Sequence, residues 1–271
     1  MKSAVTISLV PEARGGPFVF WDDLVTGCAP AAELGFDAVE IFPPGAEALD
    51  VAKVAQLLGA HGLNCAAIGT GAGWVKHKLR LTDPDAAVRQ RAIGFVGEII
   101  DVAGALGAPA IIGSMQGRWG DGVARDQALD CLGEALATLA ERAARHRVPL
   151  LYEPLNRYET NLFNRQSDAA AFLGTLRSRN VKLLCDLFHM AIEESSIAGA
   201  LRAAGPLVGH EHFADSNRQA IGWGHTDMTP IMAALREIKY DGYLSAEVLP
   251  LPDSDSAARQ TMESFRRWTA A

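Results

Sequence analysis

The sequence lacks the features that mark several large classes of protein. Its net charge is −7 and its pI is near 5.5, so it has no basic excess with which to bind nucleic acid. Its longest apolar stretch, residues 92–113, is interrupted by Glu98 and Asp101, which argues against a transmembrane helix. The opening Met1-Lys2-Ser3 leads directly into a strand pattern and is too short for a secretory signal. We therefore expect a soluble cytoplasmic protein that binds neither nucleic acid nor a membrane.

Cysteine is scarce, and no CxxC pair occurs. We expect the four cysteines to be buried free thiols in a reducing compartment; they are Cys28, Cys65, Cys131 and Cys185. The chain also has no GxSxG elbow, no Walker loop and no Cys/His pair in a strand–turn context. Nucleophilic and phosphoryl-transfer enzymes therefore have little support.

Eight apolar runs of strand length alternate with eight stretches of helical period. The expected strands are 4–10, 37–42, 63–69, 109–113, 149–153, 181–186, 207–213 and 243–248. The expected helices are 22–34, 46–60, 83–106, 124–145, 167–177, 194–203, 228–238 and 254–268. This alternation predicts an α/β protein, a (β/α)8 TIM barrel that forms one domain over residues 1–271. An open, doubly wound sheet is the competing architecture.

Short signals mark where several of these helices begin and end. Asp83-Pro84 and Thr229-Pro230 resemble an N-cap residue followed by proline at the first helical position. Gly35, Gly62 and Gly107 resemble glycine caps that end a helix before the next strand.

Four residues that can bind a metal follow one another at the ends of the last four expected strands. They are Glu153, Asp186, His212 and Glu247, separated by 33, 26 and 35 residues, which is about one strand–helix repeat each. Strand ends on one face of a parallel barrel converge, and barrel enzymes carry their chemistry there. Three carboxylates and an imidazole would repel one another unless a divalent cation lay among them. Their oxygen-rich donor set suits Mn²⁺, Mg²⁺ or Co²⁺ better than a structural zinc.

Other polar residues lie close to these four in the sequence. His210 competes with His212, since both point to the same side of a strand. We favour His212 as the ligand because it lies nearer the strand end, and we expect His210 to support the site or pack in the core. Glu159, His189 and Arg218 follow on βα loops, where a substrate would dock.

Aromatic residues and glycines indicate how the substrate face is built. Trp74, Trp119 and Trp223 fall in loops after strands, and Phe42 ends a strand. We expect these rings to form an aromatic rim that stacks on a sugar, with Trp74 and Trp223 as substrate contacts. Residues 69–73 (GTGAG) invite a phosphate-loop interpretation. We expect instead a flexible substrate loop with no helix behind it, and no dinucleotide site.

Four segments in the second half of the chain resemble motifs of the xylose-isomerase-like barrel superfamily, on its ketose 3-epimerase branch. They are 153–161 (EPLNRYETN), 186–190 (DLFHM), His210-x-His212 with Asn217-Arg218, and Ala246-Glu247 after 240–243 (YDGY). Residues 213–216 (FADS) and 219–225 (QAIGWGH) depart from the family pattern, and this puts the substrate in doubt more than the metal.

The resemblance implies a sugar isomerase with a divalent ion, most often Mn²⁺, held by Glu153, Asp186, His212 and Glu247. Glu153 and Glu247 would also act as the acid–base pair around a metal-stabilised enediolate, and the protein would be a dimer or tetramer by analogy. Glu159, His189 and Arg218 would hold the oxygens of the sugar.

Three alternatives remain open on the same scaffold. The first is a lyase that dehydrates, decarboxylates or cleaves a keto sugar or sugar acid. The second is a metal-dependent endonuclease, which would need more histidine ligands and a basic face. The third is a barrel that binds sugar without catalysis, and the intact carboxylate pair argues against it.

Overall fold

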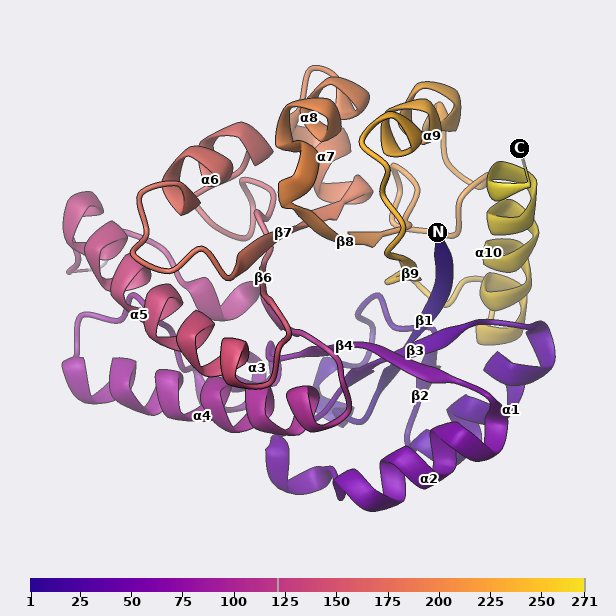
Figure 1. The fold of residues 1–271 in the computed structure, drawn as a ribbon, viewed down its shortest axis with the longest axis horizontal. Coiled ribbons are helices and arrows are strands. Elements are labelled where there is room, and N and C mark those ends of the chain that lie inside the picture. The colour runs from indigo at the N-terminus through magenta and orange to yellow at the C-terminus, as the bar shows by residue number, and fades with distance from the viewer. Residues whose placement is uncertain (121, 271) are drawn as a thin grey trace.

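Eight parallel strands close into a barrel in the computed structural model, which describes residues 1–120 and 122–270. The strands pair in chain order, and the first pairs with the last, which closes the barrel (Figure 1). They are β1 (Lys2–Ser8), β3 (Ala38–Phe42), β4 (Asn64–Gly69), β5 (Ala110–Ile112), β6 (Leu150–Tyr152), β7 (Val181–Asp186), β8 (Val208–His212) and β9 (Tyr243–Ala246). The predicted TIM barrel and its eight strands are confirmed.

Helices form a ring outside the strands, as Figure 1 shows. All eight expected helices occur: α1 (Leu24–Leu34), α2 (Val51–His61), α4 (Ala86–Ala105), α5 (Arg125–Arg145), α6 (Gln166–Leu173), α8 (Ile197–Ala204), α9 (Met228–Glu237) and α10 (Ser254–Thr269). The sequence patterns missed three short elements at the mouth of the barrel: β2 (Phe20–Trp21), α3 (Ala72–His77) and α7 (Leu187–Glu193). In the part of the chain that the structure describes there are also four 3-10 turns: η1 (Pro11–Ala13), η2 (Ala46–Ala48), η3 (Ser114–Gln116) and η4 (Gly205–Leu207).

Two expected N-cap residues, Asp83 and Thr229, were wrong. Helix α4 begins after Asp85, whose carboxylate accepts a hydrogen bond from the Ala87 amide (2.8 Å). Helix α9 begins after Asp227, which caps the Thr229 amide (3.0 Å). In both helices the N-cap is an aspartate next to the first helical residue, which the interpretation based on the proline did not consider.

The expected glycine ends were sound. Gly35 and Gly62 end α1 and α2 with φ of 86° and 66°, and Gly107 follows α4 with φ of 72°. These are left-handed conformations that glycine adopts without steric cost.

The 69–73 segment also differs from the expectation, because a helix does follow it. Helix α3 begins at Ala72, and glycine is required within it: a Cβ on Gly73 would lie 2.4 Å from the Met115 sulfur. Glycine has a poor helix propensity, so the local pattern concealed the helix. Thr70 donates its hydroxyl to the Ile111 carbonyl (2.7 Å), which ties this segment to β5.

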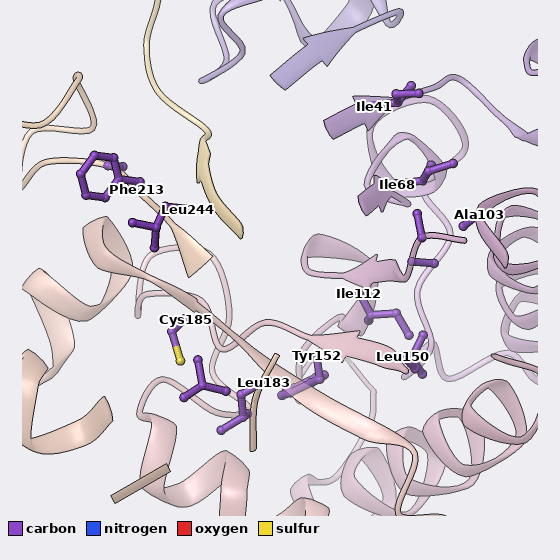
Figure 2. Close-up of a cluster of buried hydrophobic side chains, with 14 of the residues drawn as sticks. Ile41, Ile68, Ala103, Ile112, Leu150, Tyr152, Leu183, Cys185, Phe213 and Leu244 are labelled. Atoms are coloured by element: carbon purple, nitrogen blue, oxygen red, sulfur yellow. The ribbon is translucent and has the colours of Figure 1, made fainter. Parts of the chain in front are cut away.

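The apolar core lies mainly between the strands and the helices, where Figure 2 shows side chains such as Ile41, Ile68, Ile112 and Leu150. Because side chains alternate along a strand, the neighbouring positions point into the barrel. There, one apolar cluster comes from β4 to β7 and consists of Ala67, Ile111, Leu151 and Leu184. The barrel interior beside β3 and β8 carries charged groups instead, and these lie beneath the site.

The structure bears on two expectations from composition. All four cysteines are free; Cys131 is half-buried and the other three are buried. Within residues 1–120 and 122–270, no helix combines the length and hydrophobicity that crossing a membrane requires.

Candidate active site and metal centre

The structure brings the four candidate ligands together at the carboxyl ends of β6 to β9. One ligand atom from each of the four, Glu153, Asp186, His212 and Glu247, lies within 4.8 Å of the others. His212 Nδ1 is 3.5 Å from a carboxylate oxygen of Glu153, 3.5 Å from one of Asp186 and 3.6 Å from one of Glu247. Their strands are consecutive neighbours in the barrel, so the sequence spacing becomes spatial proximity.

The donor atoms of this cluster suit a divalent cation. Oε1 of Glu153, Oδ2 of Asp186 and Nδ1 of His212 are buried, and no hydrogen bond from a described residue satisfies them. Buried polar atoms are normally paired, so a group of orphaned acceptors that face one point indicates a bound ligand. Three carboxylates with one imidazole match the preference of Mn²⁺ or Mg²⁺ for oxygen-rich sites.

The protonation of the cluster is strongly perturbed. Burial and the neighbouring carboxylates raise the pKa of Glu247 to about 7, against the opposing charges of His212 and Arg218. Burial alone would also raise the pKa of Asp186, but His189, His212 and Arg218 hold it below its usual value. A cation would replace the proton that Glu247 otherwise retains near neutral pH.

Glu40 is a buried residue beside the candidate ligands that the sequence analysis missed. Its carboxylate lies 2.8 Å from His210 Nε2 and 3.2 Å from His212 Nε2, and all three side chains are buried inside the barrel. By accepting from His212 Nε2, Glu40 orients Nδ1 toward the ligand cluster, and the Nδ1 lone pair would become available when a bound cation replaces the proton on that nitrogen. His210 thus contacts Glu40 rather than the four-residue cluster.

His189 presents a hydrogen-bond donor to the site from α7. The backbone amide of Asn156 donates to His189 Nδ1 (3.2 Å), which leaves Nε2 as the protonated nitrogen. Nε2 lies 3.6 Å from Asp186 and 3.7 Å from Glu153, is buried, and has no hydrogen-bond partner among the described residues. It is therefore free to donate to a substrate oxygen.

Arg218 connects the cluster to the loop residue Glu159. Its guanidinium donates to Glu247 Oε2 (2.7 Å), lies 3.6 Å from Glu159, and stacks 4.8 Å above the Phe188 ring. The charges of Glu247 and Asp186 outweigh burial and raise the pKa of Arg218, so it stays charged. The backbone of Arg218 has a φ of 59°, an unusual value for a non-glycine residue and one that occurs often at functional sites.

A cavity of about 530 Å³ opens above this cluster, and its volume lies in the range of small-molecule sites. Trp74 lines it together with Phe18 and Phe42, whose rings stack with centroids 4.5 Å apart. An aromatic wall of this kind lies opposite the carboxylates, as a sugar-stacking surface would require.

The structure does not bring Trp223 to this cavity. Trp223 is 36% exposed and lies on a loop folded around the Asp215 carboxylate, which accepts backbone amides of Ser216, Gly222 and Thr226 at 2.7–3.0 Å. Trp119 is also at the surface, where its indole donates to the Asn161 carbonyl (2.8 Å). The aromatic rim is therefore built from Phe18, Phe42, Trp74 and Tyr158.

Known proteins resemble this chain over nearly its whole length. The family model described as xylose isomerase-like TIM barrel matches residues 28–268. A D-psicose 3-epimerase from Agrobacterium fabrum is 32% identical over 87% of this chain and 80% of its own length. An L-ribulose 3-epimerase from a Methylomonas species is 31% identical over 81% of this chain and 76% of its own.

Solved structures agree with these sequence relatives. The crystal structure of a D-allulose 3-epimerase from a Methylomonas species superposes with a TM-score of 0.80, at 26% identity and with 99% of each chain covered. The chain therefore belongs to the xylose isomerase-like TIM barrel family, on the branch of the ketose 3-epimerases, whose members are isomerases.

Proposed function

We propose that this protein is a metal-dependent epimerase that inverts the carbon beside the ketone of a small ketose. The observation that carries the proposal is the set of orphaned donor atoms on Glu153, Asp186 and His212, which meet Glu247 beneath a sugar-sized cavity. The names of the sequence relatives, D-psicose and L-ribulose 3-epimerases, support the reaction class.

The metal would be held by Glu153, Asp186, His212 and Glu247, with Mn²⁺ as our first choice and Mg²⁺ or Co²⁺ as substitutes. Such an ion supplies Lewis-acid stabilisation of the negative charge that develops on substrate oxygens. The barrel orients its ligands in advance, because Glu40 fixes the ring of His212.

Glu153 and Glu247 would move the proton. They reach the site from β6 and β9, with two strands between them, so they approach the substrate from different sides. One carboxylate removes the proton next to the ketone and the other delivers a proton to the opposite face, which inverts the carbon. A pKa near 7 for Glu247 suits an acid–base group that works at neutral pH.

The remaining polar groups would hold the sugar. His189 Nε2 and the Arg218 guanidinium point at the same region and donate to hydroxyl or carbonyl oxygens, while Glu159 accepts from a hydroxyl. Trp74 and Phe42 would cover the C–H face of the ring or chain and exclude water.

Exchange in D₂O tests the proposal. The purified protein is loaded with Mn²⁺, incubated with a panel of ketoses, and followed by proton NMR. We expect one deuterium at the inverted carbon in both the recovered ketose and its epimer. A dehydrated or shortened product would instead identify a lyase on the same scaffold, and sugar binding without any exchange would identify a non-catalytic barrel.

A cytoplasmic location and a homo-oligomeric state, dimer or tetramer, also remain proposals. The four free cysteines fit a reducing compartment. Sedimentation of the Mn²⁺-loaded protein would determine the oligomeric state.

A further inference from the structure

The two ends of the active-site cavity carry opposite charges. The reaction end, built on β6 to β9, is lined by Glu153, Glu159 and Glu247 around Arg218. On the wall that follows β4 and β5, the charged lining residues within the described chain are two arginines, Arg80 and Arg118. A substrate that reaches from one end to the other therefore meets cationic side chains away from its reacting carbon.

The loops that carry these arginines are bound to each other. The Leu81 amide donates to the Met115 carbonyl (2.9 Å), and the Thr82 hydroxyl donates to the Gln116 carbonyl (3.1 Å) and accepts from the Arg118 amide (3.0 Å). Because one backbone contact and the Thr82 hydroxyl join the two segments, the cavity wall carries both arginines on loops that are fixed to each other.

Gly117 completes this contact. It has a φ of +83°, and a Cβ at this position would lie 2.2 Å from the Thr82 hydroxyl and 3.2 Å from Arg80 Cβ. Only glycine allows the segment before Arg118 to approach the stem of Arg80 this closely.

Arg80 is held in position before any ligand binds. Its Nε and one terminal nitrogen donate to a single oxygen of Asp83 at 3.3 and 3.0 Å, and its guanidinium lies 5.6 Å from the centre of the Trp74 ring. The other carboxylate oxygen of Asp83 accepts a hydrogen bond from the Asp85 amide (3.0 Å). The Asp83 carboxylate thus pairs with Arg80 alone, and the wall, which also carries Arg118, keeps a net positive charge.

The cavity has room for a substrate with an anionic group at one end, since its volume of about 530 Å³ extends from the ligand cluster to this wall. The whole chain carries a net charge of −7, which would repel an anionic substrate unless a local positive surface compensated. Guanidinium groups bind carboxylates and phosphates through paired, charge-assisted hydrogen bonds.

We propose that Arg80 and Arg118 bind an anionic group, a carboxylate or a phosphate, at the end of the keto sugar distal to the carbon that is inverted. This inference rests on the proposed epimerase function and narrows its substrate to acidic or phosphorylated keto sugars.

The test compares three matched substrates: D-fructose, D-fructose 6-phosphate and the C6 carboxylate of the same ketose. For each, kcat/KM for deuterium wash-in is measured with the Mn²⁺-loaded protein, and binding is measured separately by calorimetry. We expect one charged substrate to exceed D-fructose at least about tenfold in kcat/KM, as for a charge-assisted contact of typical strength. The stronger of the two anions identifies the source of the charge.

The variants Arg118→Gln and Arg80→Gln should lower this charged-to-neutral ratio, each by about tenfold. Arg91→Gln, which removes the same charge from an exposed position on α4, is the matched control and should leave the ratio unchanged. Raising the salt concentration should weaken binding of the charged sugar and leave that of D-fructose unchanged.

The outcomes separate this inference from the proposed function. The inference would be overturned if wash-in were as fast with D-fructose as with either anion and if Arg118→Gln did not alter the charged-to-neutral ratio of kcat/KM. The proposed epimerase function would then still stand. Arginine-dependent binding of the charged sugar without any wash-in would uphold the anion site and overturn the epimerase.

Discussion

Two buried glutamates, one on each face of the barrel wall, differ in their hydrogen-bond partners and in the direction of their pKa shifts. Glu40 points into the barrel, where two histidines contact its carboxylate; burial alone would raise its pKa, but His212 and the hydrogen bonds hold it low. Glu211 lies on the helix-facing side of β8, neither of its oxygens has a hydrogen-bond partner among the described residues, and burial raises its pKa well above the usual value.

This contrast shows that partners, and not burial, decide whether an interior carboxylate is charged. Inside the barrel, histidines and Arg218 balance the acidic groups, so charge can be concentrated there for use. In the layer between strands and helices, burial followed by the charge of Glu211 raises the pKa values of Cys185 and Tyr240, and neither residue offers Glu211 a hydrogen bond. The interior of the barrel is thus the region prepared for ionic chemistry.

Replacing an acid–base carboxylate should produce the largest effect. Glu153→Gln and Glu247→Gln should each lower the rate of deuterium wash-in by about 10²- to 10⁴-fold, the usual contribution of general acid–base catalysis. Circular dichroism and thermal melting serve as the folding control, because glutamine preserves the volume of the side chain. A folded variant with wild-type wash-in would exclude that residue from the chemistry.

Removing the support of His212 should produce the next largest effect. Glu40→Gln should weaken Mn²⁺ binding by about 10- to 100-fold, as for other residues that orient a ligand histidine. Titration followed by electron paramagnetic resonance measures this affinity without reference to turnover. Glu47→Gln removes the same charge from the exposed η2 turn and provides the control; equal Mn²⁺ affinity in both variants would contradict the role of Glu40.

The sequence predicted the four ligand candidates because each occupies a strand end and the strands recur at a regular spacing. It could not predict Glu40, which lies within the apolar strand AVEIF and meets His210 from 170 residues away. No local pattern distinguishes a carboxylate that will face two histidines from one, like Glu211, that will face none. That difference exists only after the barrel closes.

The substrate face was harder to predict for a related reason. Trp223 was expected at the rim, but the amides gathered by Asp215 turn its loop toward the surface. Loop conformations depend on such hydrogen bonds between side chains and the backbone. These contacts produce no periodic pattern in the sequence from which they could be predicted. Trp74 lines the cavity because it lies on α3, a helix that the glycines of its sequence made hard to predict.

Relieving the unpartnered carboxylate should stabilise the Mn²⁺-loaded protein. Glu211→Met replaces Glu211 with an apolar chain of similar length and should raise the free energy of unfolding by about 1–3 kcal/mol at pH 8. Because the folded pKa lies above the unfolded value near 4.5, the carboxyl lowers stability progressively as pH rises above 4.5. The gain should therefore be smaller at pH 5 than at pH 8, as measured by urea unfolding at both.

Glu211→Gln distinguishes charge from hydrogen bonding in that experiment. It removes the titration but keeps two polar atoms, so we expect a flatter pH profile with a smaller gain than methionine gives. If methionine destabilised the protein at pH 8, Glu211 would have a stabilising partner and the contrast with Glu40 would be lost.

A surface carboxylate should show the smallest effect and the opposite dependence on pH. Asp101 on α4 accepts from Arg142 (Nε at 2.9 Å) and contacts His146 (3.0 Å), and Arg142 followed by His146 lowers its pKa to about 2 against the opposing effect of burial. Its side chain is 45% exposed, so solvent and salt screen the pair, and Asp101→Asn should cost less than about 1 kcal/mol at pH 7. Because the folded pKa lies below the unfolded value of 3.8, this stabilisation is complete above that value and is lost as pH falls toward 2. Urea unfolding at pH 7 and pH 3 measures this loss, and Asp130→Asn at an exposed position on α5 is the control. If Asp101→Asn lowered the free energy of unfolding at pH 7 by as much as Glu211→Met raises it, exposed partners would matter as much as interior ones.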